Sequence, residues 1–335
     1  MRPFKYTRAG DAANAVQIVS ANENSKFLAG GTNLIDLMKE DVMRPDELVD
    51  VTRLNLTQIK TITDGASKGG VSIGGLAKNT DTANHPLIRQ NFPLLTEAIL
   101  AGASGQIRNM ATNGGNLNQR TRCQYFYDTA MPCNKRAPGT GCGALEGVNR
   151  IHAIFGWSDK CVAVMPSDMC VALAALDAVV KVQGKDGAER IIPFADYHRL
   201  PGDTPEKDNN LNQGELITAI EIPKNNFAAR SRYLKVRDRA SYAFALVSVA
   251  AALETDGNKI SQARIAMGGV AHKPWRALEA EKFLAGREAT EANFKQAADT
   301  EMKGARPLEY NKFKVELGRR AIVRALTQAL NGGAA

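Results

Sequence analysis

The spacing of apolar residues at the start of the chain predicts a small α/β unit. From Asp11 to Val19 apolar residues recur every three or four positions, which predicts an amphipathic helix with Asp11 as its cap. A short apolar run at 27–29 and another at 48–51 predict strands. Together these elements form a first unit over residues 1–58.

A glycine turn joins the strand at 27–29 to a predicted helix at 34–39. The turn is Gly30-Gly31-Thr32-Asn33. A strand that leads through glycines into a helix start is an anion-binding arrangement, because backbone N–H groups and the helix dipole favour negative charge. Glycine also permits close approach of a phosphate. The turn matches neither GxGxxG nor GxxxxGK[ST], so an ordinary turn is an equally good interpretation.

The middle of the chain contains both the apolar spacing of helices and the alternation of strands. The patterns predict a strand at 71–75, a helix capped by Thr80 or Asp81, a helix at 94–101, a helix and then a strand over 168–182, and an edge-like strand at 215–223. Asp168 either caps its helix or binds a ligand that carries hydroxyl groups. The segment 106–117 is rich in polar and small residues, which indicates either backbone close to a ligand or a turn between strands.

A boundary near residue 225 separates a last unit. Strand-like runs at 232–237, 244–253 and 263–270 are followed by helical patterns from residue 279 onward. This order of strands and then helices predicts a separate α+β domain.

Four of the five cysteines gather in one segment rich in glycine and proline. These are Cys123, Cys133, Cys142 and Cys161, and Cys170 follows within an apolar helix pattern. The spacing contains no CxxC, so it fits zinc ribbons and the common ferredoxin patterns poorly. A metal or cluster site, buried free thiols, two disulfides and structural zinc all remain open. The odd count excludes complete disulfide pairing within the chain.

Aromatic and basic side chains accompany these cysteines. Tyr125, Phe126, Tyr127 and Trp157 would exclude water from a site there. Arg122, Lys135 and Arg136 would offset the charge of thiolate ligands.

Composition narrows the class of protein. A chain of 335 residues is long enough for two or three domains, and 44% hydrophobic with 23% charged residues is ordinary for a globular protein. The net charge is +8, but the basic residues are scattered, so we expect no nucleic-acid binding. No apolar run reaches the roughly 18 residues of a membrane span. The N-terminus shows no signal core or twin-arginine pair, so any export would depend on a partner.

Seven motifs occur in a fixed order along nearly the whole chain. They are Phe27-Leu28-Ala29-Gly30-Gly31-Thr32-Asn33-Leu34, Gln106-Ile107-Arg108-Asn109, Thr112-Asn113-Gly114-Gly115-Asn116, Ser167-Asp168, Gly214-Glu215-Leu216-Ile217, Tyr233-Leu234-Lys235-Val236-Arg237 and Met267-Gly268-Gly269-Val270-Ala271. This set resembles the FAD-binding subunits of the xanthine dehydrogenase, or molybdenum hydroxylase, family. The resemblance implies an α+β fold, with a PCMH-type FAD-binding domain in two parts, 1–58 and 59–225, and a CO dehydrogenase flavoprotein C-terminal-like domain over 226–335.

The cysteine segment narrows this resemblance. The insertion at about 119–162 is similar to that of the flavin subunits of bacterial periplasmic aldehyde oxidoreductases, which resemble 4-hydroxybenzoyl-CoA reductase in carrying a [4Fe–4S] cluster. The resemblance implies cluster ligands at Cys123, Cys133, Cys142 and Cys161 and leaves Cys170 as a buried thiol.

The resemblance also implies the FAD contacts. Asp168 would contact the hydroxyl-bearing chain of the flavin, Leu216 would pack on the ring system, and Lys235 would tune the flavin by its charge. The pyrophosphate would lie against Lys26, Phe27, Leu28, Ala29, Gly30, Gly31, Thr32, Asn33 and Leu34, and Thr112, Gly115 and Asn116 would form a second cofactor loop.

The implied assembly is a heterotrimer. A large subunit with the molybdenum cofactor would oxidise an aldehyde to a carboxylic acid, and a small subunit would carry two [2Fe–2S] clusters. This chain would pass their electrons through FAD to an external acceptor, with no catalytic residue of its own. We expect the periplasm, by export with a partner, or otherwise the cytoplasm. The alternatives are a flavin subunit of a 4-hydroxybenzoyl-CoA reductase-like or xanthine dehydrogenase-like enzyme, and a non-catalytic scaffold.

Overall fold

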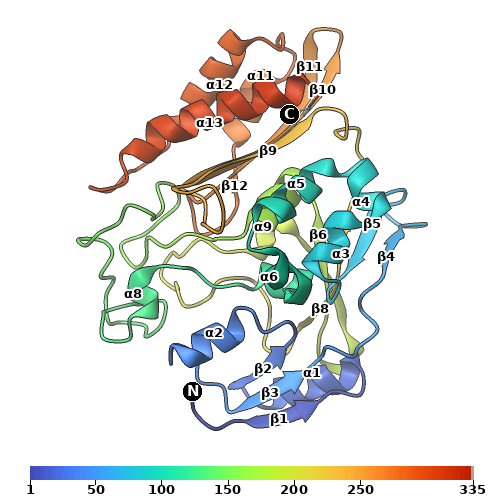
Figure 1. Cartoon of the computed structure of the whole chain (residues 1–335), viewed down its shortest axis with the longest axis vertical. Helices are drawn as coiled ribbons and strands as arrows, with labels where there is room; N and C mark the ends of the chain where they lie inside the picture. Colours follow the sequence, from blue (N-terminus) through green and yellow to red (C-terminus); the bar gives the residue numbers. More distant parts are fainter. Residues whose placement is uncertain (333–335) are drawn as a thin grey trace.

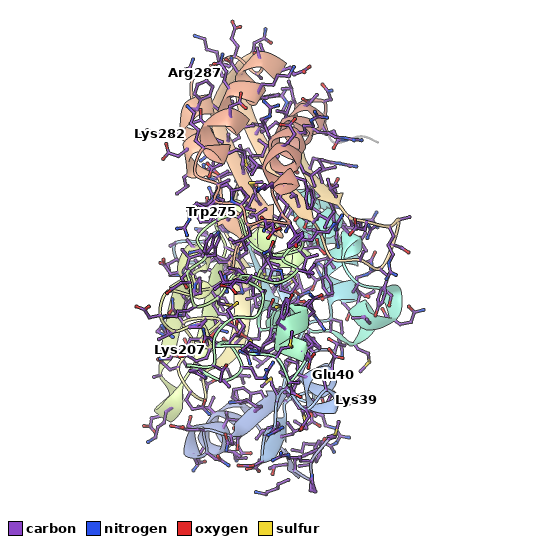
Figure 2. The ribbon with its side chains drawn as sticks, turned by 90° about the vertical axis from the view of Figure 1, so that its left-hand side faces the viewer. Lys39, Glu40, Lys207, Trp275, Lys282 and Arg287 are labelled. Carbon is purple, nitrogen blue, oxygen red and sulfur yellow. The ribbon has the colours of Figure 1, made fainter. Side chains whose placement is uncertain are left out.

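The computed structural model describes residues 1–332 and contains three β-sheets with helices between and around them (Figure 1). Each sheet and its helices form one part of the molecule, and in the side view these three parts lie one above another (Figure 2). Lys39 and Glu40 lie near the first part, Trp275 lies lower in the third part, and Lys282 and Arg287 lie on its helices. The division into domains at residues 58 and 225 stays a prediction, and each sheet is built from one of the three predicted segments.

The first sheet is parallel, with the strand order β1-β3-β2. Asp11 caps the first helix as predicted, since its Oδ1 accepts the N–H of Asn14 at 2.7 Å. The central strand is buried along its whole length. The elements are β1 (Lys5–Arg8), α1 (Ala12–Ala21), β2 (Ser25–Leu28), α2 (Leu34–Lys39) and β3 (Glu47–Asp50).

The second sheet is antiparallel, with the strand order β4-β5-β8-β6-β7. The prediction of an edge strand at 215–223 is wrong, because β8 lies at the centre, between β5 and β6. Alternation along a strand reports which side chains are buried, but it does not reveal which distant strands pair with it. The strands are β4 (Ile59–Thr61), β5 (Val71–Gly74), β6 (Val179–Gln183), β7 (Glu189–Pro193) and β8 (Leu216–Ile222).

Short helices cover this sheet, and several of them line the pocket that is described below. The predicted cap at Thr80 or Asp81 is wrong, because the first of them starts after Lys78 without a side-chain cap. The segment 106–117 forms two short helices rather than a turn between strands. The helices are α3 (Asn79–Asn84), α4 (Pro86–Asn91), α5 (Pro93–Ala101), α6 (Gly105–Met110), α7 (Asn113–Leu117), α8 (Gln124–Tyr127), α9 (Asp168–Ala175), the 3₁₀ turn η1 (Lys185–Gly187) and α10 (Phe194–Tyr197).

The third sheet lies between two helical layers, which explains the continuous apolar pattern of its strands. Val249 and Ala251 belong to the core under the C-terminal helices, whereas Ala250 and Ala252 belong to the core around α9. The packing of the sheet against the core around α9 brings β9 next to the start of α9. The elements are β9 (Ser231–Val236), β10 (Val247–Asp256), β11 (Lys259–Gly268), β12 (Trp275–Arg276), α11 (Leu278–Leu284), α12 (Glu291–Met302) and α13 (Phe313–Leu330).

Candidate cofactor site

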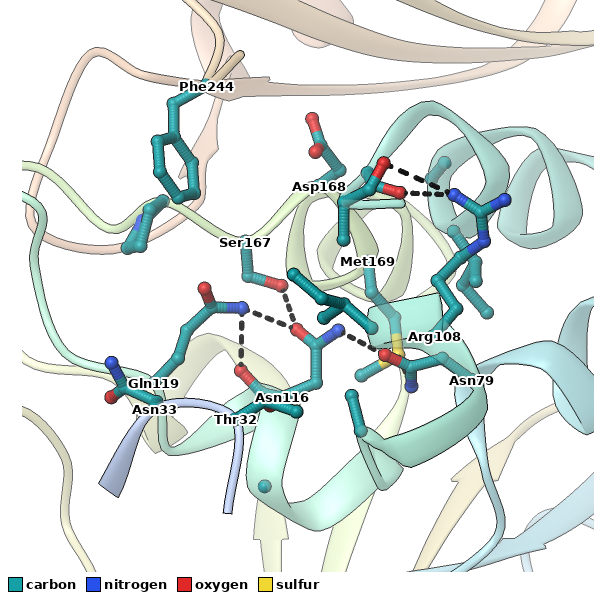
Figure 3. A pocket seen from close by; sticks show the side chains of 18 of the residues that line it. Thr32, Asn33, Asn79, Arg108, Asn116, Gln119, Ser167, Asp168, Met169 and Phe244 are labelled. Carbon is teal, nitrogen blue, oxygen red and sulfur yellow. Dashed lines mark hydrogen bonds between the residues drawn. The ribbon is translucent and has the colours of Figure 1, made fainter. Parts of the chain in front are cut away.

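A pocket of about 370 Å³ opens where all three parts of the chain meet. It lies beside the start of α9, under the loop that carries Phe244 (Figure 3). Its walls come from segments far apart in the sequence. The lining residues used below are Thr32, Asn33, Asp36, Asn79, Arg108, Gly115, Asn116, Gln119, Arg122, Ser167, Asp168, Lys235 and Phe244.

One wall is a network of amides centred on Asn116 (Figure 3). Its Nδ2 donates to Asn79 Oδ1 at 2.8 Å, and its Oδ1 accepts from Ser167 Oγ at 2.6 Å. Gln119 Nε2 also donates to this Oδ1, at 2.7 Å. Because the amides hold one another, this wall is ordered before any ligand binds.

The opposite wall holds an almost completely buried ion pair. Lys235 Nζ lies 2.7 Å from Asp168 Oδ2, and the two side chains are 5% and 7% exposed. Tyr233 donates its hydroxyl to Asp168 Oδ1 at 2.6 Å. The capping role for Asp168 is wrong: Ser167 caps α9, since its Oγ accepts the N–H of Cys170 at 3.1 Å. The carboxylate of Asp168 is therefore turned toward the third sheet.

Removing the cation of this pair is expected to destabilise the fold. Lys235→Met would leave the Asp168 carboxylate buried with Tyr233 as its remaining side-chain donor, and such a loss costs about 3–5 kcal/mol. Urea unfolding of the purified chain measures this change. Lys295→Met, which removes the exposed pair with Glu291, is the control and is expected to unfold as the wild type does. Equal unfolding midpoints for both variants would contradict the expectation.

The backbone of the glycine turn packs directly against the backbone at the end of α6. A Cβ on Gly30 would lie 2.1 Å from the carbonyl oxygen of Met110, so this position accepts glycine alone. The next residue, Gly31, has a φ of +70°, which also favours glycine. Asn33 accepts the N–H of Arg120 through Oδ1 at 2.9 Å, but its buried Nδ2 has no hydrogen-bond partner among residues 1–332. An unused donor at the pocket wall suits an anionic or carbonyl-bearing ligand.

Some of the residues predicted to contact FAD line the pocket, and others do not. Thr32, Asn33, Gly115, Asn116, Asp168 and Lys235 line the pocket. The residues Lys26, Phe27, Leu28, Ala29, Gly30, Gly31 and Leu34 lie outside this lining, in β2, the turn and the start of α2. Thr112 caps α7 through the N–H of Gly115 at 3.2 Å. Leu216 packs into the core with Val16 and Val19. The contacts of all these residues with FAD stay predictions.

Asn79 and Gln119 line the pocket, and no sequence pattern predicted a role for either of them. Asn79 is the first residue of a short helix, and its partner Asn116 is 37 residues away. An isolated asparagine or glutamine is common on any surface, so neither position carried a local signal. Only the folding of α3 against α7 brings them together.

The four clustered cysteines lie in one apolar cluster with Leu37, Phe126, Val162 and their neighbours. All five cysteines are unpaired, so the alternative of two disulfides is wrong. Cys133 and Cys142 pair as a β-bridge. Within residues 1–332, no three His, Cys, Asp or Glu side chains form a group that would hold a metal ion.

Burial and a hydrogen bond between two of these thiols shift their pKa values in different directions. A hydrogen bond with Cys161 lowers the pKa of Cys142 to about 6, and the same bond raises the pKa of Cys161. Burial raises the pKa of Cys123 to about 12, and that of Cys170 equally. The thiolate forms of Cys123, Cys161 and Cys170 are thus unfavourable unless a positive centre offsets their charge, whereas that of Cys142 is favoured.

A charged clamp fixes the cysteine segment to the loop before β8. Asp208 accepts from Arg120 Nε at 2.7 Å and from Lys135 Nζ at 2.6 Å. Lys135 also donates to the carbonyl of Pro205 at 2.6 Å. On the other side, Arg122 NH1 lies 2.8 Å from Asp36 Oδ2. Lys135 and Arg122 are therefore engaged by carboxylates, in addition to any effect they have on the sulfurs.

The clamp predicts acid sensitivity. Burial alone would raise the pKa of Asp208, but the charges of Lys135 and Arg120 lower it to about 2. An unfolded aspartate has a pKa of about 3.9, so the pair stabilises the fold above about pH 4 and this contribution disappears as the pH falls toward 2. At pH 7 the free energy of unfolding of Asp208→Asn should be about 1–2 kcal/mol below that of the wild type. Below pH 3 this difference should become small, because the wild type has then lost the same contribution. Urea unfolding at pH 7, 4 and 2.5 measures this, with the exposed Asp159→Asn as control. An unchanged pH profile in Asp208→Asn would disprove it.

A second cavity of about 230 Å³ joins the pocket to the cysteine segment. It shares Arg122, Ser167, Asp168 and Phe244 with the first pocket and reaches Cys123. The two candidate cofactor regions are therefore neighbours.

Comparison with known proteins agrees with this geometry. Residues 2–225 match the FAD binding domain in molybdopterin dehydrogenase, and residues 232–329 match the CO dehydrogenase flavoprotein C-terminal domain. The chain belongs to the FAD-binding subunits of the molybdenum hydroxylase family. The predicted family, the fold class, the FAD cofactor and the role as an oxidoreductase subunit are confirmed.

The relatives named here match nearly the whole length of this flavin subunit. It is 47% identical to the aldehyde oxidoreductase FAD-binding subunit PaoB of Escherichia coli K12, over 98% of this chain and 99% of that one. It is 30% identical to the glyceraldehyde dehydrogenase medium chain of Sulfolobus acidocaldarius, over 97% and 95%. A solved chain of the reconstituted CO dehydrogenase from Oligotropha carboxidovorans superposes with a TM-score of 0.77, over 99% of both chains at 24% identity, and shows the same fold. No helix within residues 1–332 is long and apolar enough to cross a membrane.

Proposed function

We propose that this flavin subunit is the electron-transfer subunit of a heterotrimeric, molybdenum-dependent aldehyde oxidoreductase. The observation that carries the proposal is the 47% identity to an aldehyde oxidoreductase FAD-binding subunit over 98% of the chain. Electrons from aldehyde oxidation would arrive from [2Fe–2S] clusters of a small subunit and leave through FAD to an external acceptor. The aldehyde would react in a large subunit that holds the molybdenum cofactor.

The residues of the pocket suit FAD. Bound FAD supplies a carrier that accepts and releases electrons, and the protein positions it and excludes water. The unpartnered Nδ2 of Asn33 offers a donor to a phosphate or ring carbonyl. The amide network of Asn116 fixes one wall, and the pair of Asp168 and Lys235 provides a fixed charge arrangement on the other. The side chains hold these positions through their own hydrogen bonds.

The cysteine segment suits a [4Fe–4S] cluster bound by Cys123, Cys133, Cys142 and Cys161. Thiolates are the soft ligands that iron–sulfur clusters require. Such a cluster joins its thiolates through several irons and sulfides, so the ligands surround a shared space and need not meet at one ion. The four thiols lie in one apolar cluster, whereas Cys170 lies in a different core. A cluster would also supply the positive centre that buried thiolates need.

The proposal includes the partners and the compartment. The large and small subunits would complete a heterotrimer, and this chain would reach the periplasm with a partner that carries the signal. Fractionation of cells that express all three subunits tests the compartment, and export of this chain when it is expressed without either partner would contradict the proposal.

Metal and flavin analysis of the purified complex tests the function. We expect one FAD, one molybdenum and about four irons beyond those of the small subunit's clusters per heterotrimer. We also expect oxidation of aldehydes and no turnover of xanthine. Flavin with zinc or without extra iron would remove the cluster from the proposal. Turnover of xanthine in place of aldehydes would remove the substrate class.

A further inference from the structure

The ring of His152 contacts one of the proposed cluster ligands. Its Nε2 lies 3.1 Å from Cys123 Sγ, and the residue is 1% exposed. Its other nitrogen, Nδ1, is buried and has no hydrogen-bond partner in the part of the chain that the structure describes. The sulfur is therefore the polar partner of this imidazole ring.

The backbone of His152 is held from the C-terminal part of the chain. Its carbonyl oxygen accepts from Lys314 Nζ at 2.9 Å and from Asn311 Nδ2 at 3.2 Å, and both side chains are completely buried. Lys314 also donates to the carbonyl of Gly269 at 2.7 Å. The start of α13 and the turn after β11 thus fix the loop that carries the ring.

The chemistry of the contact depends on which group holds the proton. A thiolate bound to iron has no proton to donate, so the hydrogen of this contact belongs to Nε2 of the imidazole. Neutral imidazole with its proton on Nε2 and the doubly protonated form both donate at this atom. An N–H group that faces a cluster sulfur stabilises negative charge there, and the reduced cluster carries more of it.

We propose that His152 donates its Nε2–H to the sulfur of Cys123 and raises the reduction potential of the [4Fe–4S] cluster, with Asn311 and Lys314 as positioning residues. The inference rests on the proposed cluster. It gives the C-terminal domain a direct effect on the redox properties of the insertion, because the residues that place the ring belong to α13 and the turn before it.

Redox titration of the purified heterotrimer, followed by EPR of the cluster, tests the inference. In His152→Leu the equilibrium between the oxidised and reduced cluster is expected to shift about tenfold toward the oxidised form, which is about 59 mV for one electron. His152→Gln retains an N–H donor and should shift less. The [2Fe–2S] signals of the small subunit, measured in the same samples, serve as the internal control. Iron content should equal that of the wild type in both variants.

A second measurement needs no variant. Pulsed EPR of the wild-type heterotrimer labelled with ¹⁵N-histidine is expected to show the weak coupling of a nitrogen hydrogen-bonded to a sulfur ligand. The strong coupling of an iron-bound nitrogen would overturn the inference, and so would the absence of any coupling.

The outcomes separate this inference from the function on which it rests. A wild-type heterotrimer without the additional four irons would overturn the cluster and the inference together. A wild-type cluster with an unchanged potential in His152→Leu would overturn the inference alone. Equal loss of iron in the leucine and glutamine variants would show that the ring is a ligand or a packing element, which also overturns it.

Discussion

Serine at Cys123, Cys133 or Cys142 is expected to remove the cluster iron from the heterotrimer and to lower its melting temperature. A site whose ligands come from distant parts of a loop forms only on folding, so the free energy of metal binding is part of the free energy of folding. The segment 118–167 has one four-residue helix, α8, so little regular structure remains to hold it without the cluster. Iron content and thermal unfolding measure the two effects.

The fifth cysteine is the matched control for this prediction. Cys170 is fully buried inside α9, in the core shared with Leu173 and Ala250. Cys170→Ala avoids burying a hydroxyl group and is expected to keep all the iron. Cys161→Ser is expected to lose it. If iron depends on Cys170 and survives in Cys161→Ser, the proposed ligand set is wrong.

Alanine at Gly30 is expected to weaken FAD binding. The added Cβ would meet the carbonyl oxygen of Met110 at 2.1 Å and the Cα of Ala111 at 3.1 Å, so backbone must move. Overpacking of this kind costs about 1–3 kcal/mol and would displace the turn that carries Thr32 and Asn33 into the pocket. Flavin content after purification, and the affinity for added FAD, measure the loss, which we expect to exceed about tenfold.

Gly105→Ala is the control for this substitution. Gly105 starts α6, the same helix that ends at Met110, and a Cβ there meets nothing within 4 Å. This variant should bind FAD as the wild type does and be at least as stable, because alanine restricts the unfolded chain. Equal flavin content in Gly30→Ala and Gly105→Ala would show that close packing of the turn does not support FAD binding.

The cysteine segment shows the limit of motif reasoning. Spacing alone left four interpretations of the thiols, and resemblance to a family supplied a ligand set. The structure removed the disulfides and gathered the four thiols in one apolar cluster. It also added His152, a residue with no sequence signal, because its partner Cys123 is 29 residues away and its loop is held by α13.

The sequence by itself determined the local elements and the family. Helical spacing placed α1 and its cap at Asp11, the apolar runs placed β2 and β3, and the ordered motifs from Phe27 to Ala271 identified the family. These features are local, because a period of two or 3.6 residues is fixed by which face of an element is buried.

Only the tertiary structure decided which distant groups meet. It placed β8 at the centre of its sheet and gave the cap of α9 to Ser167. It also paired Asp168 with Lys235, 67 residues later, inside the pocket wall. The physical reason is that a pattern records how deeply a side chain is buried, whereas its partners are chosen by the packing of whole elements against one another.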